Sequence, residues 1–310
     1  MDMMVAGIDV SKDRLDVCVL PKCEAFQVSR DAKGIDELVV RLAGADLIAV
    51  EATGRYESIV SASLAAAGLP LVVVNPGQVR HYAQALGQRA KTDPIDARVI
   101  ALFAAATKPQ IRPFADEATR LLSALIVRRR QIIEMIVAEG HRARMTSDGR
   151  LKKSIARLTK ALERELSDID AGIDEQICKS PAWSEMEALL TSMPGVGPVT
   201  ARTLIGEMPE LGRLNAKQIA ALAGLAPFTR QSGKWRGKSF TGGGRSSVRS
   251  ALFLAAMAAR RYNRILKSFA DRLAAKGKPK IVVIVAVARK LLTILNAMIR
   301  DRQPWTEQNA

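Results

Sequence analysis

Two aspartates stand three residues apart in the segment 91–98, which reads KTDPIDAR. Pro94 suits the first turn of a helix, and the residue before a proline avoids helical backbone angles, so we predict Asp93 as the N-cap. Asp96 then falls in the same first turn and on the same side of the helix. Taken alone, the pair is explained by a helix cap and a carboxylate favoured by the helix dipole.

Two further acids interrupt strands that are otherwise apolar. Asp9 lies inside the predicted strand 4–10, and Glu51 ends the predicted strand 47–51. An acid in an apolar strand is costly unless it is paired, hydrogen-bonded or bound to a metal ion. Converging carboxylates repel one another, and a divalent cation relieves that repulsion; oxygen-only ligation suits Mg²⁺ or Mn²⁺. The predicted ligands are Asp9, Glu51, Asp93 and Asp96. The alternative is four unrelated acids at strand ends and caps.

The order of elements in the first third explains how these acids meet. Three strands come first, and later strands alternate with helices. Strands are predicted at 4–10, 15–20, 25–29, 47–51 and 71–74, and helices at 35–44, at 59–68 and from Asp93 onward. Such an order indicates an α/β mixed sheet with flanking helices, and it is the order of the ribonuclease H-like fold. The first and fourth strands are neighbours in that fold, which places Asp9 beside Glu51.

The middle of the chain changes to a helical pattern. Apolar residues recur at steps of three and four within 117–177, and a polar break at 145–149 divides them. This pattern predicts two long helices in an antiparallel hairpin or coiled coil, either an ordinary helical pair or a dimerisation segment. The predicted domains are therefore 1–115, the helical segment 116–180, and a mainly α domain at 181–310.

The net charge of +16 is concentrated at the C-terminal end. Residues 1–115 hold 13 Lys+Arg and 13 Asp+Glu, residues 116–210 hold 14 and 15, and residues 211–310 hold 20 and 3. A surface that serves only solubility would mix positive and negative side chains, whereas a local surplus of Lys and Arg is typical of a surface that binds a polyanion. We therefore expect nucleic acid as the partner of the last third.

Two glycine-bearing segments are candidates for that contact. MPGVGP at 193–198 lies between two helical stretches and is similar to the hairpin of helix-hairpin-helix modules, whose amides face a phosphate. RQSGKWRGKSFTGGGRSSVR at 230–249 lies between apolar helices and is predicted to be a functional loop. The predicted nucleic-acid contacts are Gly195, Gly197, Arg230, Lys234, Arg236, Lys238, Arg245, Arg249, Arg260 and Arg261.

Several classes of protein are disfavoured. Three cysteines and two histidines show no metal-ligand spacing, so a zinc site is not expected. The best apolar run, 281–288, stops at Arg289 and Lys290, short of the ~20 residues that span a bilayer. The N-terminus lacks the pattern of a signal segment. These features predict a cytoplasmic, nucleoid-associated protein without a membrane partner.

Five blocks of the sequence occur together and in order. They are GIDVSKDRLDV (7–17), EATGRYE (51–57), KTDPIDA (91–97), MPGVGPVTA (193–201) and AGLAPFTRQSGKWRGKSFTGGGRSSVRSAL (223–252). This combination resembles the insertion-sequence transposases of the IS-one-ten family, which includes the pilin-gene invertases, over nearly the whole chain. The resemblance implies a RuvC-like domain whose Asp-Glu-Asp-Asp metal site maps onto the four acids. It also implies a serine nucleophile, a bridge RNA that pairs with donor and target DNA, and a homodimer or homotetramer.

The serine implied by the resemblance is assigned to Ser232. It could attack a phosphodiester if it were activated and if the developing charge were stabilised. The metal site would activate the hydroxyl, and Arg230, Lys234 or Arg236 would stabilise the developing charge. Ser239 is the rival, followed by Ser246 and Ser247; a turn or a phosphate hydrogen bond is the structural alternative for any of them.

The sequence thus favours a bridge-RNA-guided DNA transposase that acts on double-stranded DNA. A hydrolytic Holliday-junction resolvase with the same acids and a non-catalytic nucleic-acid-binding protein are the alternatives. The four acids disfavour the binding protein, and the loop with Ser232 is superfluous for a water-driven nuclease. Target and donor sites, the RNA sequence and the oligomer number are not encoded in recognisable form.

The charge distribution makes a prediction about fragments. Residues 178–310 should bind nucleic acid well, with an affinity that falls steeply as salt rises, because each phosphate contact releases counterions. Residues 1–115 should bind weakly. Fluorescence anisotropy with labelled DNA across a salt series measures both slopes, and equal slopes would show that the charge placement is misleading.

Overall fold

The chain forms two compact units, Met1–Ala115 and Asp116–Ala310. The computed structural model describes residues 3–52, 54, 56–88, 93–111, 116–229, 231–233, 235–237 and 239–307, with the backbone alone at 93, 94, 235 and 236. Each unit has its own hydrophobic core.

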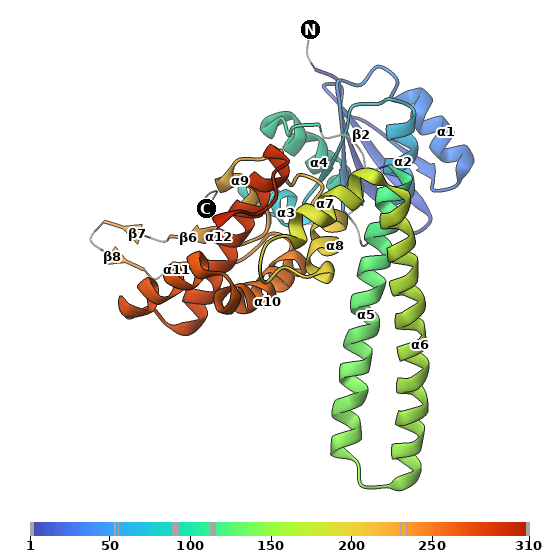
Figure 1. The fold of residues 1–310 in the computed structure, drawn as a ribbon. Helices are drawn as coiled ribbons and strands as arrows, with labels where there is room; N and C mark the ends of the chain where they lie inside the picture. Colours follow the sequence, from blue (N-terminus) through green and yellow to red (C-terminus); the bar gives the residue numbers. More distant parts are fainter. Residues whose placement is uncertain are drawn as a thin grey trace. The chain divides into compact units, whose positions relative to one another are not determined.

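Unit 1 is built on a mixed sheet of five strands (Figure 1). They are Val5–Val10 (β1), Arg14–Leu20 (β2), Glu24–Ser29 (β3), Leu47–Glu51 (β4) and Leu71–Val74 (β5). The order across the sheet is β3-β2-β1-β4-β5. β2 is antiparallel to β1 and β3, while β4 is parallel to β1 and β5. The predicted mixed sheet with flanking helices is confirmed.

Helices cover both faces of this sheet. The helices of unit 1 are Ala32–Arg41 (α1), Glu57–Ala66 (α2), Pro76–Ala85 (α3) and Asp93–Thr107 (α4). Alternate strand residues point to opposite faces. Ile8 and Val50 join the core that includes residues of α1 and α2, whereas Val5 and Ala49 join the core that includes residues of α3 and α4.

Helix α3 is not among the elements predicted from the sequence, which has no helix between the strand 71–74 and Asp93. In the structure Asn75 is the N-cap, its Oδ1 accepts a hydrogen bond from the amide of Gly77 at 2.8 Å, and Pro76 occupies the first turn. Only Val79 in α3 is buried. Its core-facing stripe is short, with Tyr82 and Ala83 partly buried beside Val79, so the periodicity on which a sequence-based assignment depends is weak.

A close backbone contact in unit 1 joins α4 to β1 at Gly7. A Cβ atom on Gly7 would lie 2.3 Å from the amide nitrogen of Ala101 and 2.3 Å from the carbonyl oxygen of Ala97. Both are backbone atoms of a helix whose Ala97, Ala101 and Ala104 are fully buried. Glycine on the strand and alanines on the helix allow the two backbones to meet, and this contact fixes α4 on the sheet.

We predict that Gly7→Ala destabilises unit 1 by at least about 2 kcal/mol, because neither backbone can yield without moving α4. Gly44→Ala is the matched control, since a Cβ there meets only the sulfur of Met4, at 4.0 Å. Thermal or denaturant unfolding of the two variants measures the difference. Equal stability of the variants would contradict the importance of the close contact.

Unit 2 begins with a long helical hairpin, Glu117–Met145 (α5) and Gly149–Lys179 (α6), which lie side by side (Figure 1). Asp116 and Asp148 cap the two helices by accepting hydrogen bonds from backbone amides. The break predicted at 145–149 therefore corresponds to the turn of the hairpin. Whether the hairpin mediates self-association stays a prediction.

The root of the hairpin belongs to the core of unit 2. Four of its buried side chains, Leu122, Ile126, Ile173 and Ile177, join the same cluster as residues of the C-terminal helices. A fragment that starts at residue 178 would lose all four. The salt dependence of DNA binding should therefore be compared between the fragments 1–115 and 116–310, in place of 178–310.

The remaining elements of unit 2 are mainly helical. They are Pro181–Thr191 (α7), Pro198–Glu207 (α8), Ala216–Leu222 (α9), Pro227–Phe228 (β6), Gln231–Ser232 (β7), Trp235–Arg236 (β8), Phe240–Thr241 (β9), Ser246–Tyr262 (α10), Arg264–Ala275 (α11) and Lys280–Asp301 (α12). The apolar run 281–288 lies within α12, which continues past Arg289 and Lys290 to Asp301. Among the described residues, α12 alone is long and apolar enough to cross a membrane. Val287, Leu291 and Leu295 are fully buried in the core of unit 2, as in a core helix.

Candidate active site

Asp9 and Glu51 lie on neighbouring parallel strands of unit 1. Ile8 of β1 pairs with Val50 of β4, so the next residue on each strand is one of the two acids. Asp9 shares a face with Gly7, which contacts α4, and Glu51 shares that face with Ala49. Both acids are partly buried. The two carboxylates therefore belong to adjacent positions on the face that α4 covers.

Two residues extend this row across the sheet, and the sequence analysis missed both. Asp16 of β2 is directly opposite Asp9, and Gln27 of β3 is directly opposite Asp16. Asp16 is only 2% exposed. Its Oδ1 accepts a hydrogen bond from Nε2 of Gln27 at 2.5 Å, and its Oδ2 accepts one from Nε of Arg14 at 3.3 Å. An acid inside the apolar pattern of residues 15–20 was the available signal, the same one that identified Asp9.

The other two predicted ligands belong to the start of α4. The helix begins at Asp93, one residue earlier than expected, and the side chain of Asp93 lies outside the described residues. Asp96 follows in the first turn and is partly buried. Among the described side chains, no three His, Cys, Asp or Glu gather closely enough to hold a metal ion. The four-acid site therefore stays a prediction.

Ser232 lies at the end of a β-hairpin in unit 2. Phe228 of β6 pairs with Phe240 of β9, and Ser232 of β7 pairs with Trp235 of β8. Gly233 follows the serine with a φ of +55°, in the left-handed region that favours glycine. Ser232 is exposed. The glycine-rich segment expected to be a loop thus presents this serine at a tight turn.

The base of the hairpin is fastened by backbone contacts and two arginines. A Cβ atom on Gly244 would lie 2.4 Å from the amide nitrogen of Gly224 and 2.5 Å from the carbonyl oxygen of Leu222. Arg249 donates to the carbonyl oxygen of Gly243. Arg245 makes a bidentate ion pair with Glu210, at 2.5 and 2.7 Å. Arg245 and Arg249, predicted to bind nucleic acid, therefore have structural roles that the sequence did not reveal.

Ser239, the rival nucleophile, lines a pocket of about 790 Å³ beside the hairpin. The pocket is mostly apolar, with Phe240 from β9 and Phe269 from α11 among its walls. Arg289 and Lys290 of α12 supply its only positive charges among the lining residues described. The two candidate serines thus occupy different settings, one on an exposed hairpin and the other beside a pocket.

The other predicted nucleic-acid contacts are dispersed over unit 2. Arg260 and Arg261 occupy the last turn of α10. A Cβ on Gly195 would lie 2.4 Å from backbone atoms of Ala259, so packing against α10 explains this glycine. Gly197 is exposed at the N-terminus of α8. Arg230, Lys234 and Lys238, and the side chain of Arg236, lie outside the described residues.

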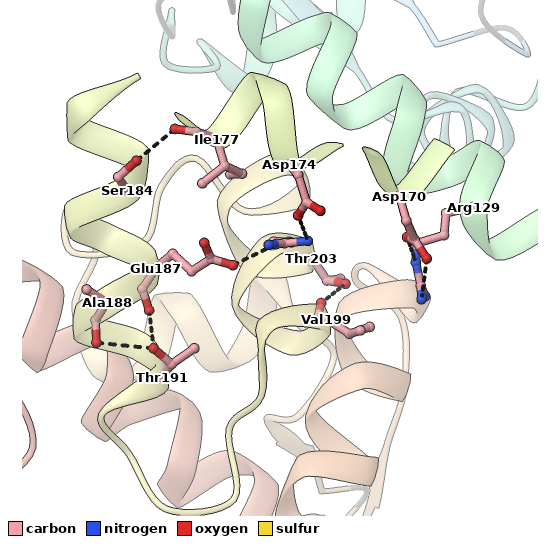
Figure 2. Close-up of polar contacts among 11 residues, drawn as sticks. Arg129, Asp170, Asp174, Ile177, Ser184, Glu187, Ala188, Thr191, Val199 and Thr203 are labelled. Carbon is pink, nitrogen blue, oxygen red and sulfur yellow. Dashed lines mark hydrogen bonds and ion pairs between the residues drawn. The ribbon is translucent and has the colours of Figure 1, made fainter. Parts of the chain in front are cut away.

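Ion pairs join α5 to α6 within the helical hairpin, and join α6 to the helices α7 and α8 that follow it (Figure 2). Arg129 of α5 pairs with Asp170 of α6 at 2.5 Å. Arg202 of α8 pairs at 2.6 Å with both Asp174 of α6 and Glu187 of α7. Burial acts to lower the pKa of Arg202, but its hydrogen bonds and charge interactions with Glu187 and Asp174 outweigh burial and raise that pKa. The positive charge that joins these helices is therefore retained at every physiological pH.

The comparisons with known proteins agree on one family. Residues 6–148 match a family described as transposase, and residues 187–271 match the transposase IS116/IS110/IS902 family. The pilin gene-inverting proteins of Moraxella bovis and Moraxella lacunata are each 29% identical to this chain, and the match covers 99% of either sequence. An uncharacterized 43.6 kDa protein of insertion element IS110 from Streptomyces coelicolor is 31% identical over 48% of this chain and 36% of the relative.

A mixed sheet that carries paired acids, followed by a basic helical unit, thus occurs in an enzyme that rearranges DNA. The chain belongs to the IS110 (IS-one-ten) family of transposases. It is a DNA transposase or recombinase, and its substrate is DNA.

Two neighbouring glycines test the role of the hairpin base. Gly244→Ala should lower recombination at least about tenfold, because the new Cβ would meet backbone atoms and a φ of +59° is strained for alanine. Gly242→Ala should retain activity, since no atom lies within 4 Å of its Cβ position and its φ is not positive. A recombination assay with matched amounts of folded protein measures the difference. Comparable loss in both variants would contradict a specific role for the base.

Proposed function

We propose that this transposase cuts and rejoins DNA through a covalent bond to Ser232, assisted by Mg²⁺ or Mn²⁺ at the four acids and guided by a bridge RNA. The exposed position of Ser232 on a hairpin with a fastened base is the observation that carries the proposal. A nucleophile must reach a phosphorus atom closely and in one orientation. A short, anchored hairpin meets both needs better than a mobile linker would.

The donors present fit a hard divalent cation. Asp9 and Glu51 offer carboxylate oxygens from adjacent strand positions on one face, and the first turn of α4 adds two further carboxylates at residues 93 and 96. Oxygen-only donor sets suit Mg²⁺ and Mn²⁺. A cation bound there would activate the attacking hydroxyl and stabilise charge on the phosphate.

The proposed step conserves the phosphodiester bond energy. Ser232 Oγ loses its proton and forms a bond to phosphorus, while the bond from phosphorus to one sugar oxygen breaks and that oxygen takes up a proton. The product is a phosphoserine ester. The reverse attack by a different sugar hydroxyl releases the serine and joins a new pair of strands, so no external energy source is needed. Basic side chains of the same hairpin would stabilise the charge that develops on phosphate.

The finer features of the proposal rest on the family. The strand order and the mixed pairing support a ribonuclease H-like, RuvC-like unit 1. The short turn between α7 and α8 supports a helix-hairpin-helix-like contact with a phosphate backbone. The hairpin of α5 and α6 is a candidate coiled coil for a homodimer or homotetramer. The proposed setting is the cytoplasm, on nucleoid DNA.

A covalent intermediate can be trapped and assigned. Ser232→Ala should keep DNA binding, because one hydroxyl adds little to a contact made mainly by Arg and Lys side chains. The variant should nevertheless lose recombination and form no denaturant-resistant DNA adduct. Asp9→Asn should also lose strand exchange, by at least about a hundredfold, while unit 1 stays folded. Gel mobility under denaturing conditions and a recombination assay measure both.

Ser239→Ala is the matched control for the serine. Loss of the adduct in Ser239→Ala with retention in Ser232→Ala would move the nucleophile to the pocket residue. Cleavage that persists without either serine would instead identify a metal-dependent hydrolase of the Holliday-junction resolvase type. Omitting the RNA encoded beside the gene, while supplying both DNA partners, tests the bridge RNA separately.

A further inference from the structure

Asp16 is a buried acid that the proposed chemistry does not use. It lies in the middle of a polar row that crosses four strands, Gln27 on β3, Asp16 on β2, Asp9 on β1 and Glu51 on β4. Directly opposed residues of an antiparallel pair share a face, with Cβ atoms about 4.5–5.5 Å apart. The row lies on the α4 face, because Leu20, four residues after Asp16 on the same strand, belongs to that core.

The position of Asp16 is unfavourable for the fold alone. Like charges directly opposite one another destabilise a sheet, and a buried ion pair is often less stable than an apolar replacement. Cys18 and Leu20, which follow Asp16 on the same face of β2, are buried apolar residues. A third apolar residue would suit β2 better by this criterion, so the charge itself needs an explanation.

The contacts of Asp16 hold its charge in place beside Asp9. Each carboxylate oxygen of Asp16 accepts one hydrogen bond, from Gln27 or from Arg14. The Arg14 side chain is 50% exposed, so solvent weakens its compensation of the buried charge. Asp16 therefore adds negative potential beside Asp9.

We propose that Asp16 is a positioning residue that strengthens divalent-cation binding at Asp9 without itself being a ligand. The inference rests on the metal site proposed above. Its electrostatic role makes two predictions of opposite sign, since loss of the Asp16 charge should weaken binding, whereas loss of the Arg14 charge should tighten it.

Titration of the full-length protein with Mn²⁺ by calorimetry tests this inference without an activity assay. Asp16→Asn should weaken Mn²⁺ binding by about 10- to 100-fold. Arg14→Gln should tighten it by roughly threefold or more, because the carboxylates then face less positive charge. Glu24→Gln is the matched control, an exposed acid on β3 whose side chain alternates to the other face, and it should leave binding unchanged.

The remaining outcomes separate this inference from the metal site itself. Asp9→Asn should abolish Mn²⁺ binding; if it does not, the metal site is wrong and the inference falls with it. If Asp9→Asn abolishes binding but Asp16→Asn changes only the unfolding temperature, Asp16 is structural and the inference is overturned. Should Asp16→Asn fail to fold, Arg14→Gln decides, and unchanged or weaker Mn²⁺ binding in that variant overturns the inference.

Discussion

The close approach of α4 to β1 is the contact on which unit 1 depends. Gly7 has no side chain, and the backbone of α4 at Ala97 and Ala101 occupies the space that a Cβ would take. Interiors are packed too densely to absorb a clash between two backbones. The contact therefore fixes the helix that begins with Asp93 relative to the strand that carries Asp9, and the spacing of these acids depends on it.

Unit 2 also contains a close backbone contact made possible by glycine, and this one lies at the base of the β-hairpin. Gly224 and Gly244 bring the end of α9 and the start of α10 into backbone contact, and the hairpin with Ser232 projects from this junction. Arg245 and Glu210 add a partly buried ion pair beside it. The glycine- and serine-rich segment 230–249 therefore follows packed structure and ends in it, although its composition alone is typical of a flexible linker. The many glycines of this segment serve turns and close packing as much as access to DNA.

Charge has two separate uses in this enzyme. Arg129 pairs with Asp170 and joins α5 to α6, whereas Arg202 pairs with Asp174 and Glu187 and joins α6 to α7 and α8. Such partly buried, hydrogen-bonded pairs hold geometry, and their removal leaves acids without compensation. The surplus of Lys and Arg in residues 211–310 is the positive charge available to bind a polyanion. Within that surplus, Arg245 pairs with Glu210 and Arg249 donates to the carbonyl oxygen of Gly243, so net charge alone overstates the number of arginines that can contact nucleic acid.

The sequence by itself determined the mixed sheet, the two long helices and their turn, because apolar periodicity follows directly from burial. It also identified Asp9 and Glu51, since an acid in an apolar strand is conspicuous. Only the tertiary structure placed Asp16 opposite Asp9 and assigned Arg245 to Glu210, because strand register and contacts between distant residues are set by packing. Helix α3 was missed although its start signal, Asn75 followed by Pro76, is present in the sequence. Its apolar stripe is short, and only the packed structure shows that Val79, Tyr82 and Ala83 face a core.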